Sequence, residues 1–232
     1  MPPSRNTEVS MIPDLTPIFA RYEALAAEAD ALFTRVHDAY PQCVTCARGC
    51  SDCCHALFDL SLVEAMYLNR AFIAAYDYGR ERSDILERAA ETDRRTTRLK
   101  REMYRASREG KSPEEIMEDA ARLRVRCPLL GTDERCLLYG QRPVTCRLDG
   151  VPSAIAGKGH VCGKTAFVKG APYPTVNMDK IQDRLAGLSQ DIADAVQSRF
   201  TELHQVYVPV SMALITRYDE AYLGIGPAPK ED

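Results

Sequence analysis

The sequence predicts a mainly α-helical domain of five to six helices around a loop-rich cysteine region, with minor β-structure. Three observations predict this class. Long segments repeat apolar residues at three- and four-residue steps, which is the period of a helix. Strands do not alternate with helices, and the cysteines gather in two irregular segments, 43–54 and 127–165. A chain of 232 residues can bury one core without disulfides, so a single domain over 1–232 is expected.

The first expected helix covers residues 13–40. It begins at Pro13 and ends before Pro41, because proline starts helices readily but cannot continue them. One apolar stripe runs along this segment: Leu15, Ile18, Phe19, Tyr22, Leu25, Ala26, Ala29, Leu32, Phe33 and Val36. A stripe of this kind packs against a core.

The second helix is expected at residues 62–76. It opens with a capping box, in which Ser61 is the N-cap and Glu64 stands three residues further on. The segment is apolar nearly all round, as are helices at the centre of a core. Since the cysteine segment 43–54 directly precedes it, the sequence places that segment on a buried, rigid element.

Residues 80–126 form a charged helical insertion between the two cysteine segments. A long polar helix is expected over 80–110, and a second one from Ser112 to Arg126, where serine precedes proline and two glutamates. Helical spacing puts five arginines on one face of the long helix: Arg94, Arg98, Arg101, Arg105 and Arg108. Such a stripe points to RNA, an acidic partner or a phosphorylated ligand, against the commoner explanation of a solvated helix face.

Residues 127–176 lack a helical period. They are expected to form loops with two short strands, near Cys136–Tyr139 and Thr165–Val168. The C-terminal helices are expected within 179–223. The first covers 179–204, and the second runs from Ser211 to Leu223 beyond the break at Pro209.

Charge and targeting patterns bound the class of protein. A net charge of -3 gives no general attraction to nucleic acid or anionic membranes. No apolar run is long enough to predict a transmembrane helix, and the N-terminus has no signal-peptide pattern. A cytoplasmic protein with reduced thiols is therefore expected. Nine cysteines, an odd number in uneven clusters, do not suit a secreted disulfide framework.

The segment 43–54 is the strongest functional pattern, since it holds five of the nine cysteines. Thiolates held so close repel one another unless a metal neutralises them. The spacing Cys46-x3-Cys50-x2-Cys53 suits a [4Fe–4S] cluster that is completed by a remote cysteine. An iron–sulfur centre, with [4Fe–4S] favoured, is therefore expected. Zinc is the alternative, because Cys50-x2-Cys53 and Cys43-x2-Cys46 also fit zinc pairs.

Eight cysteines are expected to ligate one centre, or two centres of four ligands each: Cys46, Cys50, Cys53, Cys54, Cys127, Cys136, Cys146 and Cys162. Ligands split between two distant segments would close the long loop between them. Whether Cys43, His55 or His160 is a further ligand stays open. Arg142 and Arg147 stand where they can offset thiolate charge and donate hydrogen bonds to sulfur.

The triplet spacing also occurs in radical S-adenosylmethionine enzymes, which place it after the first strand of a βα barrel. Here helices are expected on both sides of it. Asp52 stands where those enzymes usually have an aromatic residue, and Cys54 and the four downstream cysteines exceed what that chemistry needs. The sequence therefore does not favour this class.

These residues resemble the YkgJ-like cysteine-cluster family, described as a zinc- or iron-chelating CxxCxxCC domain. The resemblance covers about residues 43–165. It rests on Cys46-x3-Cys50-x2-Cys53-Cys54 and, downstream, on Cys127-Pro128, Cys136, Tyr139-x2-Arg142-Pro143-x2-Cys146-Arg147 and Cys162. It implies a metal or iron–sulfur protein. A lysine N-methylase in that family carries a similar cluster, which adds methyl transfer to the roles considered, although this chain is too short for that enzyme's full architecture.

No Ser/His/Asp set, phosphate loop or acid pair marks an organic active site, so no catalytic residue is identified and enzymatic activity stays open. The favoured role is redox, sulfur or metal handling by an iron–sulfur protein. The alternatives are a structural zinc protein that acts as an interaction module, and a cluster-dependent methyl or sulfur transferase.

Overall fold

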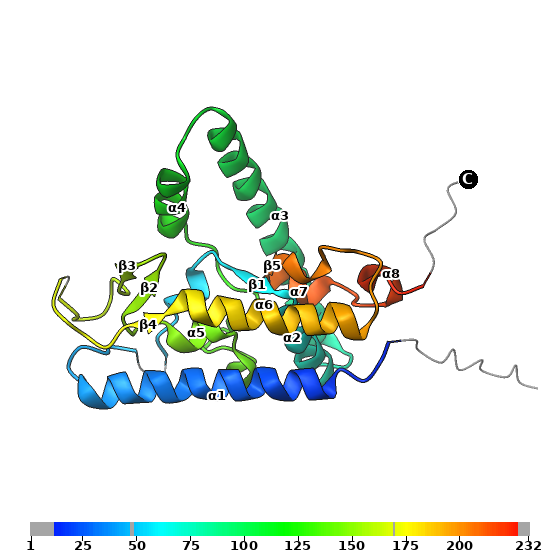
Figure 1. Cartoon of the computed structure of the whole chain (residues 1–232), viewed down its shortest axis with the longest axis horizontal. Helices are drawn as coiled ribbons and strands as arrows, with labels where there is room; N and C mark the ends of the chain where they lie inside the picture. Colours follow the sequence, from blue (N-terminus) through cyan, green and yellow to red (C-terminus); the bar gives the residue numbers. More distant parts are fainter. Residues whose placement is uncertain (1–11, 47–48, 169, 227–232) are drawn as a thin grey trace, which may run out of the picture.

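The computed structural model describes residues 12–46, 49–168 and 170–226. Over these residues the protein is mainly helical with little sheet, as predicted (Figure 1). The described part holds eight α-helices: α1 Thr16–Ala39, α2 Leu62–Ala75, α3 Arg80–Arg108, α4 Pro113–Arg122, α5 Val144–Leu148, α6 Met178–Ala195, α7 Val210–Ile215 and α8 Glu220–Leu223. The number exceeds the predicted five to six because α5 is too short to show a helical period in the sequence and the predicted closing helix is divided into α7 and α8.

The two sheets are small. β1 (Asp59–Ser61) pairs antiparallel with β5 (Tyr207–Pro209). β2 (Ser153–Ile155) pairs antiparallel with β3 (Lys158–His160) and parallel with β4 (Val176–Asn177). The registers place Leu60 opposite Val208, Ala154 opposite Gly159 and Ser153 opposite Val176.

Both predicted strand positions were wrong. Cys136 forms a single isolated bridge with Leu130, and the chain then turns into the 3₁₀ segment Tyr139–Gln141, because Leu138 is drawn into the core. Residues 165–168 form no strand. There the backbone makes one bond to the first cysteine segment while Phe167 is buried, so the apolar residues serve packing rather than pairing.

Helices α1, α2 and α6 enclose the main core, with α1 and α6 side by side (Figure 1). The predicted stripe of α1 is confirmed, since its buried residues are Ile18, Phe19, Tyr22, Leu25, Ala26, Ala29 and Val36. α2 is buried over its first two turns and again at Phe72, whereas Ile73 near its end is 47% exposed. A second core lies where Leu68 and Phe72 of α2 meet Ile85 and Ala89 of α3.

α6 ends at Ala195, nine residues before the end predicted at residue 204. The cause is a left-handed cap at Gln197, whose φ is 50°. Ser198 N–H donates to the Ala193 carbonyl and Gln197 N–H to the Asp194 carbonyl, which is the Schellman pattern. Glycine usually occupies this position. Because glutamine stands here instead, the sequence does not predict that the helix ends at this point.

The predicted closing helix 211–223 is two helices, α7 and α8. The buried side chain of Asn69 explains the break after Ile215. Its amide donates to the carbonyls of Ala213, Leu214 and Thr216, at 2.9, 3.4 and 3.1 Å. The last carbonyls of α7 therefore find their partner in the Asn69 amide of α2 and not in a further helical turn. The backbone of Thr216 is extended, and the helix ends there.

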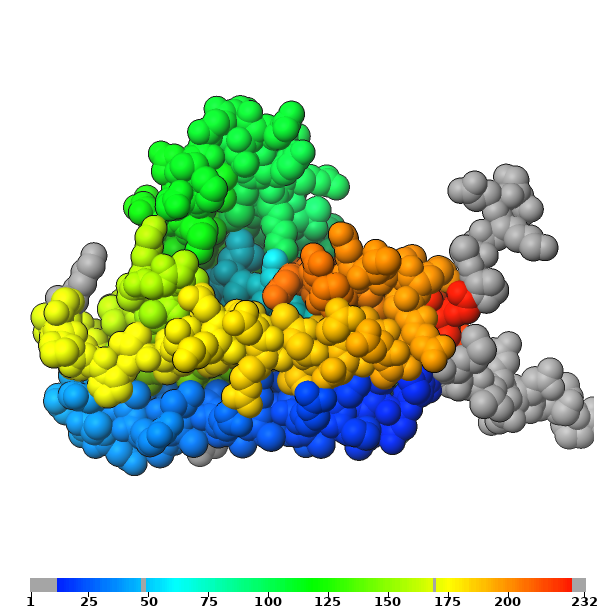
Figure 2. Space-filling model, viewed as in Figure 1, coloured from blue at the N-terminus to red at the C-terminus, as the bar shows by residue number. Residues whose placement is uncertain are grey.

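α3 and α4 project from the body as an arm (Figure 2). α4 starts at the predicted N-cap Ser112, which forms a capping box with Glu115, but it ends at Arg122, four residues before the predicted end. It buries no residue, so it gains little from tertiary packing. Among the described residues, no helix combines the length and apolar character needed to cross a bilayer.

The predicted capping box of α2 is confirmed, and its acid does more than cap. Glu64 is 3% exposed, and its carboxylate accepts from Ser61 N–H at 3.2 Å and from Ser61 O–H at 2.9 Å. It also accepts from Val144 N–H, at the start of α5, at 3.1 Å. Burial raises the pKa of Glu64, and the hydrogen bonds from Val144 and Ser61 offset part of that rise. The carboxylate therefore ties α5 to α2.

We expect the substitution Glu64→Gln to destabilise the protein by about 2 kcal/mol, because the amide presents a donor to a buried N–H group and leaves it unpaired. For a chain of this size the melting temperature should fall by roughly 4–8 °C. Differential scanning calorimetry measures the change. Glu87→Gln on the exposed side of α3 is the matched control and should change little. Equal melting temperatures for the two variants would contradict this role.

Candidate metal centre

Two backbone hydrogen bonds join the cysteine segments. Cys127 N–H donates to the Cys54 carbonyl at 2.7 Å, and Val125 N–H donates to the His55 carbonyl at 2.9 Å. The chain between them contains α2, α3 and α4. The structure therefore closes this long insertion at its base and brings Cys53, Cys54 and Cys127 together.

A tight turn then brings Cys136 back beside Cys127. Gly131 N–H donates to the Arg135 carbonyl and Leu137 N–H to the Leu129 carbonyl, both at 2.8 Å. Glu134 adopts a left-handed φ of 58° within the turn. Because Leu129 and Leu138 are buried on the core side, the turn is anchored from within.

α5 carries Cys146, and Arg147 fixes its position. The buried guanidinium of Arg147 donates to the backbone carbonyls of Arg142 and Gly140 and to the carboxylate of Asp30 on α1. Together with the bond from Val144 to Glu64, these contacts hold a five-residue helix that is too short to be stable alone.

Five thiols from these segments line one narrow pocket: Cys53, Cys54, Cys127, Cys136 and Cys146. Its other walls are largely apolar and include Phe58, Leu68 and Leu138. Arg142 also lines the pocket. Its guanidinium lies 3.6 Å from the centre of the Tyr139 ring, and its Nε donates to the Tyr139 carbonyl. Arg126, which bonds Glu134 and the Gly131 carbonyl, lines it too. The pocket thus combines several thiols, an apolar wall and two positioned cations.

The pocket thiols do not ionise alike. The neighbouring thiols of Cys146 and Cys54 donate hydrogen bonds to the sulfur of Cys53 and lower its pKa. The pKa of each donor is raised, because its proton is held in that hydrogen bond. Burial raises the pKa of Cys127 to about 12. Cys53 is therefore the pocket thiol that most readily becomes a thiolate.

The other three predicted ligands, Cys46, Cys50 and Cys162, form a second group. The chain from Cys162 onward lies beside the first segment, because Ala166 N–H donates to the Cys43 carbonyl at 2.9 Å and Thr45 O–H to the Lys164 carbonyl at 2.6 Å. Cys46 Sγ lies 3.6 Å from the Asp149 carbonyl oxygen. This group therefore sits at the junction of the first segment with the chain around Asp149.

Two aspartates accompany this second group. Cys162 Sγ lies 3.7 Å from a carboxylate oxygen of Asp52, which also pairs with Arg124 and Lys164. Burial, together with the nearby Asp149, Cys50 and Cys162, raises the pKa of Cys46 to about 12. Burial also raises the pKa of Asp149 to about 6. Sequence reasoning did not identify Asp149, although it stands three residues after Cys146.

Cys43 lies apart from both groups. It is 7% exposed and packs in the main core beside Val44, so its side chain is committed to core packing. His55 Nδ1 lies 3.0 Å from the Ser51 carbonyl oxygen, in the first segment, and His160 is exposed on β3.

Gly150 lies directly against the Cys46 side chain. A Cβ atom on Gly150 would lie 2.3 Å from Cys46 Sγ, and the residue has a φ of 95°. Both the conformation and the contact therefore require glycine. The Cys46 side chain fits here because Gly150, just beyond α5, has no side chain.

We expect Gly150→Ala to destabilise the protein by about 2 kcal/mol, because alanine is strained at this φ and its methyl group displaces Cys46. Mass spectrometry after brief alkylation should show faster labelling of Cys46, and the melting temperature should fall. Gly159→Ala is the control, since nothing lies within 4 Å of that position and its φ is not left-handed. Unchanged labelling of Cys46 would contradict the contact.

Within the described ranges, no group of three or more His, Cys, Asp or Glu side chains is arranged so that it could hold a metal ion. All nine cysteines are free thiols. No family model, no curated protein and no solved structure matches this chain. The geometry and the chemistry of the thiols are therefore the basis for a functional proposal.

Proposed function

We propose that this protein binds an iron–sulfur centre, [4Fe–4S] being favoured, through thiols of both cysteine segments. The observation that carries the proposal is the pocket on which Cys53, Cys54, Cys127, Cys136 and Cys146 converge from separate parts of the chain. Thiolates are the usual protein ligands of such clusters. Binding requires these side chains to turn toward a common point, which couples ligation to ordering of the loops.

The spacing of the thiols favours a cluster over a structural zinc ion. A structural zinc site takes four ligands, usually from closely spaced pairs. Five thiols line this pocket, and Cys43 is committed to the core, which leaves Cys50-x2-Cys53 as the remaining pair of the first segment. An apolar wall and the cation of Arg142 are also features that tune a cluster's potential.

All eight predicted ligands have a place in this proposal. Cys53 lies between the two groups, because its thiolate interacts with Cys54 and Cys146 and also raises the pKa of Cys46. Two sets of four follow: Cys46, Cys50, Cys53 and Cys162, and Cys54, Cys127, Cys136 and Cys146. The same eight cysteines carry the resemblance to the YkgJ-like family. Reduced thiols in this number fit a cytosolic protein with a redox, sulfur- or metal-handling role.

Protein purified without oxygen should be brown, with a broad visible absorption band and equal amounts of iron and sulfide. Cys136→Ala removes a ligand of the pocket set and should lose about half of the iron, and Cys50→Ala should lose the other half, from an exposed position in the second set. Absorption spectroscopy with iron, sulfide and zinc analysis measures both.

Cys43→Ala is the matched control, since it makes the same change outside both thiol groups, and it should keep its iron. A colourless protein with stoichiometric zinc would replace the proposal with a structural zinc domain. Full iron content in Cys50→Ala would remove the second group from the ligand set.

A further inference from the structure

The arm carries a strongly basic surface that the thiol sites do not use. Residues 94–108 of α3 contain seven arginines and lysines and one acid, Glu102. The five arginines of the predicted stripe are all exposed: Arg94, Arg98, Arg101, Arg105 and Arg108. None of the five forms an ion pair with the residues that the structure describes. We call this row the arginine stripe.

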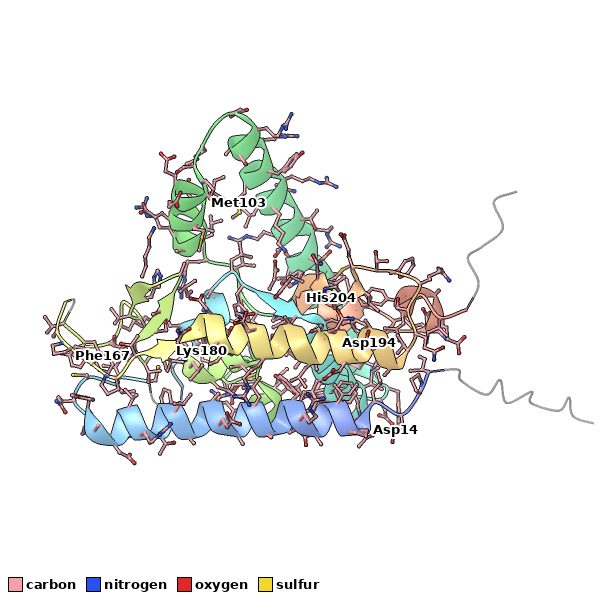
Figure 3. The ribbon with its side chains drawn as sticks, in the orientation of Figure 1. Asp14, Met103, Phe167, Lys180, Asp194 and His204 are labelled. Carbon is pink, nitrogen blue, oxygen red and sulfur yellow. The ribbon has the colours of Figure 1, made fainter. Side chains whose placement is uncertain are left out.

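The arginine stripe faces away from the body. The buried residues of α3 are Ile85, Ala89 and Thr96, and helical spacing puts them on the side opposite the stripe. Met103 continues that buried side and lies toward α4 (Figure 3). The exposed acids of α4 therefore lie across α3 from the stripe, where they do not neutralise it.

The shape of the stripe suits a linear polyanion. Its fourteen-residue span corresponds to about 21 Å along the helix, with one guanidinium every turn. Guanidinium groups match phosphate oxygens with paired hydrogen bonds. A row of this length, on a projecting arm, follows a phosphate backbone better than it fits a compact acidic patch.

The composition of this face argues against a protein partner. The centres of protein–protein interfaces are depleted of charge and rely on buried apolar and aromatic anchors. On α3 the one large apolar side chain that is exposed is Tyr104, beside the stripe. Surfaces that bind nucleic acid are instead polar and strongly positive. A single aromatic residue is too few for the base stacking on which single-strand binding relies.

We propose that the arginine stripe binds double-stranded DNA through its phosphates, without sequence preference. A helix of about 10–12 Å diameter fits the major groove of B-form DNA, which is about 12 Å wide. The major groove of an A-form RNA duplex is too narrow to admit it. The net charge of the whole chain is -3, so attraction comes from the stripe and not from overall charge.

The test is fluorescence anisotropy with the full chain and a labelled 30-base-pair DNA duplex of random sequence. Five phosphate contacts predict a slope of about -4.5 for log affinity against log salt, which is roughly a 500-fold loss from 50 to 200 mM salt. Arg98→Glu with Arg105→Glu should lower the affinity at least tenfold and reduce the slope by about two.

The control variant combines Arg35→Glu on α1 with Lys180→Glu on α6 (Figure 3). It changes the net charge equally at two exposed positions outside the arm and should bind DNA like the wild type. Equal loss in both double variants would overturn the stripe as the binding surface. Absence of binding at 50 mM salt would overturn the proposal altogether.

Two competitors identify the ligand. An RNA duplex of the same sequence should compete more weakly than DNA, and equal or stronger competition would overturn the assignment to B-form DNA. Displacement of DNA by poly-glutamate at equal charge concentration would assign the stripe to an acidic protein instead. Iron content should be the same in both double variants, so the outcome is independent of the thiol centre.

Discussion

The buried carboxylate of Glu64 is the contact on which the arrangement of the second cysteine segment depends. A buried acid is costly unless its oxygens are paired, and here both oxygens accept hydrogen bonds from the protein. One oxygen caps α2 and the other holds the first residue of α5. Because α5 has five residues, it cannot form without such support. The position of Cys146 therefore follows from a residue on a different helix.

The thiol groups are held by few regular elements. Single backbone bonds join Cys54 to Cys127 and Cys43 to Ala166, and a turn joins Cys127 to Cys136. Loops held in this way have many solvent-exposed bonds and low local stability. A centre that binds these thiols would add its binding free energy to that of folding. The rigid element next to the first cysteine segment is α2, whose first residues are fully buried.

The two faces of α3 serve different parts of the molecule. Thr92 and Thr96 line the thiol pocket, while Arg94 and Arg98 lie exposed on the opposite side of the same turns. One helix diameter, about 10 Å, separates the two surfaces. The base of the arm therefore forms part of the pocket wall. Toward its tip, the same arm presents a separate charged surface.

Sequence pattern alone determined the long helices, because their apolar stripes and caps are local features. The stripe of α1, the capping boxes at Ser61 and Ser112, and the shared face of the five arginines all follow from spacing of three and four residues. These features can be predicted without knowing which element packs on the other side of the core.

Tertiary structure decided the features that depend on partners distant in sequence. Asn69 of α2 ends α7, because its side-chain amide donates to backbone carbonyls at the end of α7. Gln197 ends α6 in a left-handed conformation, which a glutamine in the sequence does not predict. The grouping of the thiols, with Cys53 between Cys146 and Cys46, arises from contacts across about a hundred residues. Such contacts cannot be predicted from the spacing of residues within one segment, because each depends on where two elements pack together in the fold.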